Sequence, residues 1–494
     1  MEVWRPCLQL GPGAEPLALY PCRKRNARVL PHLLPALPPI AHAIEHAVAT
    51  TFHPASSDRD RGWRGWRQIW HTMRMHSASP NANAPRPLLL PVLATAACFA
   101  LVLLAGQLAA YVPAAWIGNW PAHAVALQPH TVDRFFPFDA VWYQRIADDG
   151  YLWDPNQPHL KQDVAFFPLW PMLLRLTAIC LPAPMAARWM AVAMAAGFAF
   201  ASVVSFTALA RRLLEPSAAR IAVLLFALYP GASFLLLSYP TGLMNLLTVL
   251  ALLAVMDQRF FAAAMCAGLV TAIGPLGLGT ALTVFTMAGL NVARQTRAAG
   301  RTWPSPRAIV WLAAIGAISV AGLLAFLVWQ YIALGAPLAF IDAQDAWSLS
   351  RPWPRRIPHF LVQATILPEF VAAIGALSHA QKAHTLVALQ AGLESSLNNA
   401  AHGFALIATL ACVPVRCLPV LLQAVFTVAL FMWFDSVSRP GHATLRLTYC
   451  AIGMFLGAAW LLRNRPRLAI AAVSASACLL AGGAFLSAAG YHVV

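Results

Sequence analysis

The chain has 494 residues, of which 60% are hydrophobic and only 11% charged, and its formal net charge is +16. This composition excludes an ordinary soluble domain, because such domains carry about twice as many charged residues. The basic residues lie at the ends of apolar runs rather than on one amphipathic face, which favours membrane topology over nucleic-acid binding. Apolar runs long enough to span a bilayer recur almost to the C-terminus. We therefore expect an all-α, polytopic helical membrane protein.

Residues 1–86 differ from everything that follows them. They are rich in Arg, Pro and His and contain no long apolar run. We predict a basic cytoplasmic tail without a folded core, since this composition cannot bury enough apolar surface. Nothing in it suggests a cleaved signal peptide. An alternative is that the working protein starts at Met73 or Met75. Residues 87–494 are then the membrane domain.

The first crossing is predicted at Leu88–Val112, from the inside to the outside. Residues 113–165 form a large outer loop with more acidic than basic residues, as a translocated segment tolerates. The next apolar run, Phe166–Leu181, contains Pro168 and Pro171. It is predicted to be a helix lying at the outer surface rather than a crossing, because prolines break a spanning helix. The first outer loop therefore bears surface helices.

The remaining apolar runs bring the expected total to about eleven crossings, within one or two. The segment Arg294–Arg307 has four arginines and no acid, which places it in the cytoplasm. Residues 335–395 form a second outer region. We expect a bacterial inner-membrane protein with a cytoplasmic N-terminus. The further crossings are expected at Met185–Ala210, Ala218–Ser238, Thr241–Met256, Phe260–Ile273, Leu276–Leu290, Ala308–Leu334, Ala400–Val415, Cys417–Phe434, Ala443–Leu462 and Leu468–Ala488.

The first outer loop contains three motifs in order: Phe138-Asp139, then Ile146-Ala147-Asp148-Asp149-Gly150-Tyr151, then Phe166-Phe167-Pro168-Leu169-Trp170-Pro171. They resemble the Trp-Asp, Ile-Ala-x-x-Gly-Tyr and Phe-Phe-Pro-Leu-Tyr-Pro motifs of the PIG-V-like mannosyltransferases. That family belongs to the GT-C superfamily of integral membrane glycosyltransferases. Weaker similarity continues at Tyr229–Tyr239 and Gly335–Trp347, and the likeness covers roughly residues 88–460 by order and spacing.

The resemblance implies a GT-C-like fold and a defined reaction. A hexose, with mannose expected, would pass from a polyprenyl-phosphate sugar to a glycan or glycolipid acceptor on the extracytoplasmic face. The lipid-phosphate sugar is a substrate, and no other cofactor is expected. Two departures put the acceptor and the activity in question. Tyr239 is followed by Pro240 rather than by the family's Ser-Glu, and Gly274 stands where the family often has Arg.

Asp139 is the expected catalytic residue. Glycosyl transfer needs a base that removes the proton of the attacking hydroxyl, and a positioned carboxylate can do this. An ionisable residue at a membrane boundary is also a candidate for function on its own. The alternative is structural: Asp139 precedes a predicted helix at Ala140–Ala147, and Asp is favoured at a helix N-cap.

The departing phosphate requires cationic donors. Arg355 and Arg356 in the second outer region are the expected donors, although they could equally bind lipid headgroups. Aromatic and polar side chains would shape the pocket for sugar and lipid. The other expected substrate-binding residues are Trp142, Tyr143, Arg145, Phe167, Trp170, Tyr239 and Gln344.

Two other functions fit the same composition. A transporter or flippase of lipid-linked sugars would share a basic, aromatic groove and need no catalytic carboxylate, and an inactive homologue would tolerate the missing Glu. The expected partners are membrane lipid, a polyprenyl-phosphate-linked sugar and a glycan or glycolipid acceptor, with no nucleic acid. The nine cysteines are dispersed, and no His/Cys spacing predicts a metal site.

Overall fold

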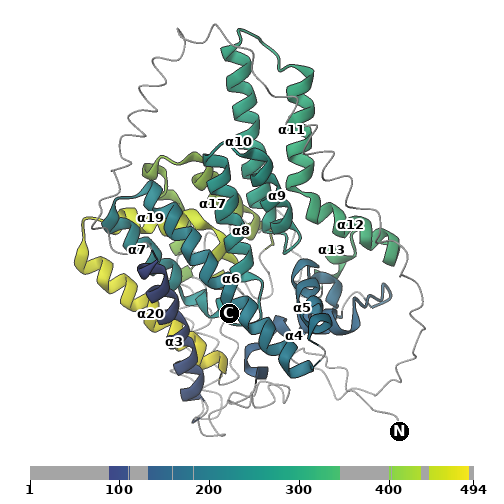
Figure 1. The fold of residues 1–494 in the computed structure, drawn as a ribbon, viewed down its shortest axis with the longest axis vertical. Coiled ribbons are helices and arrows are strands. Elements are labelled where there is room, and N and C mark those ends of the chain that lie inside the picture. The colour runs from purple at the N-terminus through teal and green to yellow at the C-terminus, as the bar shows by residue number, and fades with distance from the viewer. Residues whose placement is uncertain are drawn as a thin grey trace, which may run out of the picture. The chain divides into compact units, whose positions relative to one another are not determined.

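The structure is a computed structural model that describes residues 88–109, 111, 132–157, 160–181, 183–344, 346, 400–401, 403–434 and 444–488 (Figure 1). Every regular element in these ranges is a helix. The prediction of an all-α protein is therefore confirmed for the part of the chain described. The predicted tail at residues 1–86 lies outside these ranges.

The α-helices and 3-10 helices (η) follow one another along the chain with short connections. Their bounds are α3 Leu89–Ala109, η2 Val132–Phe135, α4 Asp139–Asp149, η3 Asp163–Ala165, α5 Leu169–Cys180, α6 Pro184–Leu213, α7 Pro216–Ala227, η4 Pro230–Leu235, α8 Thr241–Met256, α9 Phe260–Thr271, α10 Gly277–Ala298, α11 Pro306–Ser319, α12 Ala321–Leu334, α13 Ala339–Gln344, η6 Val413–Val415, α17 Leu418–Phe434, α18 Thr444–Leu447, η7 Thr448–Cys450, α19 Ile452–Leu462 and α20 Pro466–Ala488.

Three of the described helices, α3, α6 and α20, are long and apolar enough to cross a membrane. The number rises to five if each of two bent helix pairs counts as one span. These helices fit a protein embedded in a membrane, as the composition predicts. The other apolar helices are shorter, so the expected total of about eleven crossings stays a prediction.

Helix α5 corresponds to the run that the prolines marked as a surface helix. Its 12 residues rise only about 18 Å, which is less than the roughly 30 Å of hydrocarbon in a bilayer. One face is buried through Trp170 and Leu174, whereas Met172 and Ile179 on the other face are exposed. A short helix with one apolar face open suits a position along the membrane surface.

Two runs that the sequence predicts as straight crossings are bent. The helix pair α11 and α12 turns by 64° at Val320, and the segments on either side of Ala451 turn by 89°. Neither break contains Pro or Gly. At the first, Gly322 of α12 packs so closely on α9 that a Cβ there would overlap the carbonyl oxygen of Gly268. Tertiary packing, rather than local helix preference, therefore sets the bend.

At the second break, a side chain from α17 replaces the interrupted backbone pattern. The Gln423 amide nitrogen donates to the Cys450 carbonyl at 2.8 Å, and its carbonyl oxygen accepts from the Ile452 N–H at 3.1 Å. Gln423 is 1% exposed. Without these two bonds the break would leave two buried backbone groups unsatisfied, which is unfavourable in an apolar environment.

The largest core cluster holds α18 in place through aromatic side chains. Phe206 of α6 stacks on Phe226 of α7 with ring centroids 4.3 Å apart, and Phe455 of α19 meets both rings edge-on. Tyr449 donates its hydroxyl to the Phe226 carbonyl at 2.6 Å. Because Tyr449 follows α18 directly, this packing fixes the position of the short helix that carries Arg446.

Gly457 of α19 tests how tightly the helices approach one another. A Cβ at this position would overlap the carbonyl oxygen of Ala408 in the helix Gly403–Val415. We expect Gly457→Ala to lower the free energy of unfolding by about 1–3 kcal/mol, the usual effect of overpacking. Gly197→Ala in α6 is the control, since a Cβ there meets nothing within 4 Å. Thermal unfolding in detergent distinguishes the two, and an equal effect of both variants would contradict the close approach.

Candidate functional site

Asp139 lies in the first turn of α4. The preceding Phe138 occupies the N-cap position with φ +51°, an uncommon backbone conformation for a residue with a side chain. The structure thus places Phe138, rather than Asp139, at the cap that the sequence offered as the alternative role of Asp139. A carboxylate in the first turn interacts favourably with the positive end of the helix.

Tyr239 fastens the turn before α4 to the loop that precedes α8. Its hydroxyl accepts a hydrogen bond from the Asp139 N–H at 2.9 Å and donates one to the Pro137 carbonyl at 3.1 Å. The two bonds enclose Phe138. They satisfy one of the N–H groups that a helix start leaves without a backbone partner, and they hold the unusual conformation of Phe138 in place.

The Asp139 carboxylate pairs with Arg446 of α18. The Arg446 Nη1 donates to the Asp139 Oδ2 at 2.5 Å, although the two residues are 307 positions apart. The guanidinium also lies over two aromatic rings, with its Cζ 5.3 Å from the centroid of Tyr239 and 5.6 Å from that of Phe234. These contacts add cation–π attraction to the ion pair.

The ion pair is only partly buried. The side chains of Asp139 and Arg446 are 19% and 22% exposed, so a ligand can reach both. Burial raises the pKa of Tyr143, and the negative charge of Asp139 raises it further. The same two causes raise the pKa of Tyr239 well above its ordinary value. Both phenols therefore remain protonated at neutral pH and serve as hydrogen-bond donors.

Aromatic side chains frame one side of the ion pair. Tyr143 contacts Tyr239 edge-on with centroids 6.1 Å apart and meets Phe166 in the same way at 5.2 Å. Trp142 stacks on Phe166 at 5.8 Å. The fold thus brings four sequence-predicted residues, Asp139, Trp142, Tyr143 and Tyr239, to one end of α4.

Phe167 and Trp170 have other surroundings. Phe167 is 2% exposed and packs on Phe326 and Phe340, and Trp170 is 0% exposed and donates its indole N–H to the Ser238 carbonyl. In this structure both side chains anchor the first loop. Gln344 ends α13, but its side chain lies outside the described residues, as do Arg355 and Arg356 with all their structure.

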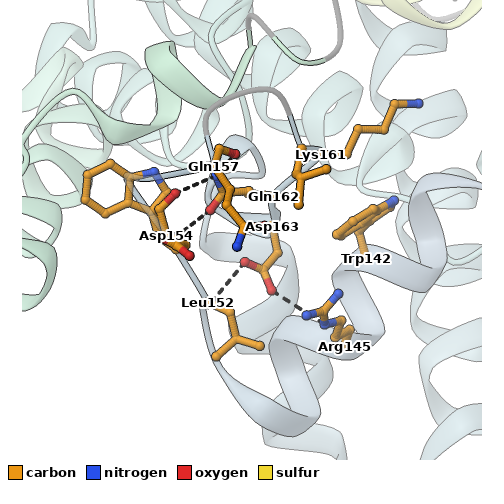
Figure 2. A pocket seen from close by; sticks show the side chains of 10 residues that line it. Trp142, Arg145, Leu152, Asp154, Gln157, Lys161, Gln162 and Asp163 are labelled. Carbon is orange, nitrogen blue, oxygen red and sulfur yellow. Dashed lines mark hydrogen bonds and ion pairs between the residues drawn. The ribbon is translucent and has the colours of Figure 1, made fainter. Parts of the chain in front are cut away.

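Trp142 and Arg145 also line a pocket of about 260 Å³ on the first loop, which Asp139 does not line (Figure 2). The buried Asp163 carboxylate lies at this pocket. Its Oδ1 accepts from the Leu152 N–H at 2.9 Å, and its Oδ2 lies 3.7 Å from the Arg145 Nε. Burial raises the pKa of Asp163, and the Leu152 N–H and the Arg145 charge partly oppose this rise.

Arg446 was missed by the sequence reasoning, which assigned the phosphate to Arg355 and Arg356. A signal for it was present. Arg446 lies inside the apolar run Ala443–Leu462, and an arginine within a predicted crossing is a candidate for function because it is unfavourable in lipid. Its pairing with Asp139 was not visible, since nothing in the sequence links two residues so far apart.

No known family profile matches the chain, and no curated protein sequence matches it. Among the described residues, no group of three or more His, Cys, Asp or Glu side chains is placed to hold a metal ion. The candidate site is therefore defined by its geometry: a carboxylate, a guanidinium and phenol donors beside aromatic walls.

The Asp139–Arg446 pair can be tested by a double-mutant cycle on stability. Asp139→Asn and Arg446→Gln should each lower the free energy of unfolding by about 1–3 kcal/mol, because each leaves a partly buried charge without its counter-charge. This is less than the roughly 3–5 kcal/mol expected for a fully buried pair. The double variant should lose less than the sum of the two, as measured by thermal unfolding in detergent.

The control cycle uses Arg212 and Asp257, which form an exposed pair at 2.9 Å with side chains 46% and 44% exposed. Its coupling energy should be about 0.2–1 kcal/mol. A coupling at Asp139 and Arg446 no larger than this would contradict the site described above.

Asp163 predicts a particular pH dependence. In the window between its ordinary pKa of 3.8 and its raised pKa in the folded state, the folded protein holds a proton that the unfolded chain has lost. Stability therefore falls as the pH rises through this window. Asp163→Asn removes the effect, so its stability relative to the original protein should increase with pH, by at most about 1.4 kcal/mol per pH unit.

Thermal unfolding at several pH values checks this prediction. Asp148→Asn is the matched control, because Asp148 is an exposed carboxylate on the neighbouring helix α4. If the two variants follow the same pH profile, burial of Asp163 does not control the stability of the loop.

Proposed function

We propose that this protein is an integral membrane glycosyltransferase that transfers a hexose, with mannose the expected sugar, from a polyprenyl-phosphate donor to an acceptor on the extracytoplasmic face. The observation that carries the proposal is the partly exposed ion pair of Asp139 and Arg446. The pair combines a carboxylate for the acceptor with a guanidinium for the leaving phosphate. The first-loop motifs that resemble those of the PIG-V-like family support the same reaction.

In the proposed step, Asp139 accepts the proton of the acceptor hydroxyl as its oxygen bonds to the anomeric carbon of the sugar. The bond from that carbon to the phosphate oxygen breaks, and the electron pair stays on the phosphate. The leaving polyprenyl phosphate thereby gains one negative charge. A carboxylate offers about four acceptor positions, so pairing with Arg446 is compatible with accepting a proton from a substrate.

Arg446 is the proposed ligand of the leaving phosphate. A guanidinium has five N–H donors, so one bond to Asp139 leaves others for phosphate oxygens. Charge-assisted bonds of this kind stabilise the charge that develops on the leaving group. Arg355 and Arg356 remain proposed donors from the second outer region. Tyr143, with its protonated phenol beside Asp139, is placed to bind a sugar hydroxyl.

A transporter or flippase of lipid-linked sugars is the second candidate. The two bent helix pairs, with breaks at Val320 and Ala451, favour it, since transporters often carry paired broken helices at the substrate site. Only the segment around the second break contains a charged residue, Arg446; Ser319, Val320 and Ala321 at the first are uncharged. This asymmetry supports the enzyme over the transporter.

The test is transfer by the purified protein. The full chain is incubated with labelled polyprenyl-phosphate mannose, glucose or arabinose, and transfer to acceptor or water is measured. Asp139→Asn should lower turnover about a hundredfold or more, the usual contribution of a general base. Arg446→Gln should lower it by about 100- to 1,000-fold, as for the loss of one oxyanion donor.

Asp257→Asn and Arg212→Gln are matched controls, because they break an exposed Asp–Arg pair elsewhere in the chain and should leave turnover unchanged. A near-normal transfer rate in Asp139→Asn would remove the proposed base. Movement of the donor across liposome membranes without any transfer would favour the transporter instead.

A further inference from the structure

The pocket on the first outer loop is a separate structure from the Asp139–Arg446 pair. It encloses about 260 Å³. The indoles of Trp142 and Trp153 line it together with four polar or charged side chains: Arg145, Asp154, Gln157 and Lys161. Figure 2 shows Trp142 and Arg145 on α4 facing the loop that carries Asp154, Gln157 and Asp163.

The loop that forms this pocket is held by its own hydrogen bonds. The Gln162 amide nitrogen donates to the carbonyls of Asp154 and Gln157, both at 3.0 Å, and its oxygen accepts from the Asp154 N–H at 2.7 Å. Gln162 is 9% exposed and Asp163 is 1% exposed. A pocket with such a floor loses little conformational entropy when it binds a ligand, which favours affinity.

One atom of the floor lacks a hydrogen bond. The Asp163 Oδ2 is buried and accepts no hydrogen bond from any described group, and the Arg145 Nε is 3.7 Å away, too far for a good one. A buried acceptor left in this state is unfavourable. A ligand hydroxyl that donates to this oxygen, or that draws Arg145 closer to it, would remove the deficit.

The mixture of side chains selects one class of ligand. A lipid tail would find two cations and two carboxylates in its way, and burying these without partners is unfavourable. A phosphate would meet the carboxylates of Asp154 and Asp163 beside the two cations. A sugar unit fits better, because its C–H groups can lie on indole faces while its hydroxyls both donate and accept hydrogen bonds. The volume lies near the lower end of the roughly 300–1,000 Å³ of small-molecule pockets.

We propose that this pocket binds a neutral saccharide unit of the acceptor, an inference that rests on the glycosyl transfer proposed above. Trp142 and Trp153 provide the apolar faces, and Arg145, Asp154 and Gln157 bind hydroxyl groups. Asp139 and Arg145 are six residues apart on α4, a rise of about 9 Å along the helix. A short glycan seated in the pocket could thus extend along α4 and present its terminal hydroxyl to Asp139.

Direct binding tests this proposal without any need for catalysis. The full-length protein in detergent is titrated with a mannose disaccharide and with maltose, and binding is followed by saturation-transfer NMR and calorimetry. We expect at least one disaccharide to bind, and Trp153→Leu to weaken its binding at least tenfold, because the substitution removes an aromatic face.

Two further variants keep the test decisive. Trp303→Leu is the matched control, since Trp303 is 81% exposed in the connection between α10 and α11 and should not affect binding. If Trp153→Leu fails to fold, Gln157→Ala replaces it, because Gln157 supports the loop through its backbone carbonyl rather than its side chain. Gln157→Ala should weaken binding at least threefold.

The outcomes separate this inference from the proposed function. Disaccharide binding that depends on Trp153 or Gln157, in a protein that transfers no sugar, would leave a saccharide site and overturn the transferase. Sugar transfer to a disaccharide whose KM is the same in Trp153→Leu and Gln157→Ala would overturn the pocket as the acceptor site. Absence of disaccharide binding, or its displacement by inorganic phosphate at equal concentration, would overturn it as well.

Discussion

The structure depends on one constraint: backbone N–H and C=O groups in apolar surroundings need partners wherever a helix is interrupted. Side chains from distant helices supply them. Gln423 bonds both sides of the break at Ala451, Tyr449 donates to the Phe226 carbonyl beyond the end of α7, and Ser476 of α20 donates to the Leu228 carbonyl. Each bond makes an irregular segment tolerable inside an apolar core. The fold can therefore contain short helices and sharp bends that a bundle of straight crossings would exclude.

The candidate site depends on these irregular segments. Tyr239 lies between η4 and α8, Asp139 starts α4 after the unusual turn at Phe138, and Arg446 belongs to a helix of four residues. A long regular helix presents its side chains on fixed faces and buries its own backbone. The short segments instead let three distant parts of the chain meet at one place. Their mutual bonds then compensate for the strain of the positive φ at Phe138.

The sequence predicts the helices better than it predicts the site. The expected crossing Thr241–Met256 matches α8, and the prolines of Phe166–Leu181 correctly indicate a short helix. The bends at Val320 and Ala451 could not be predicted, because hydropathy measures how apolar a run is and not how its neighbours pack. Asp139 was selected by its position and its motif. Arg446 was not, since its pairing with Asp139 is a long-range contact with no local pattern, and Phe167 and Trp170 show that an aromatic motif can serve packing instead.

The partners of Asp139 lie far downstream in the chain, which has a consequence for biogenesis. Tyr239 is 100 residues later and Arg446 is 307 residues later. At roughly 5–20 residues per second, ribosomes need about 15–60 s to synthesise the longer interval. The first loop therefore emerges and waits in that period before Arg446 exists. A chain truncated before α18 would lack the counter-charge of Asp139 altogether, so quality-control proteases that sample such intermediates should recognise the first loop as an unfinished part of the protein.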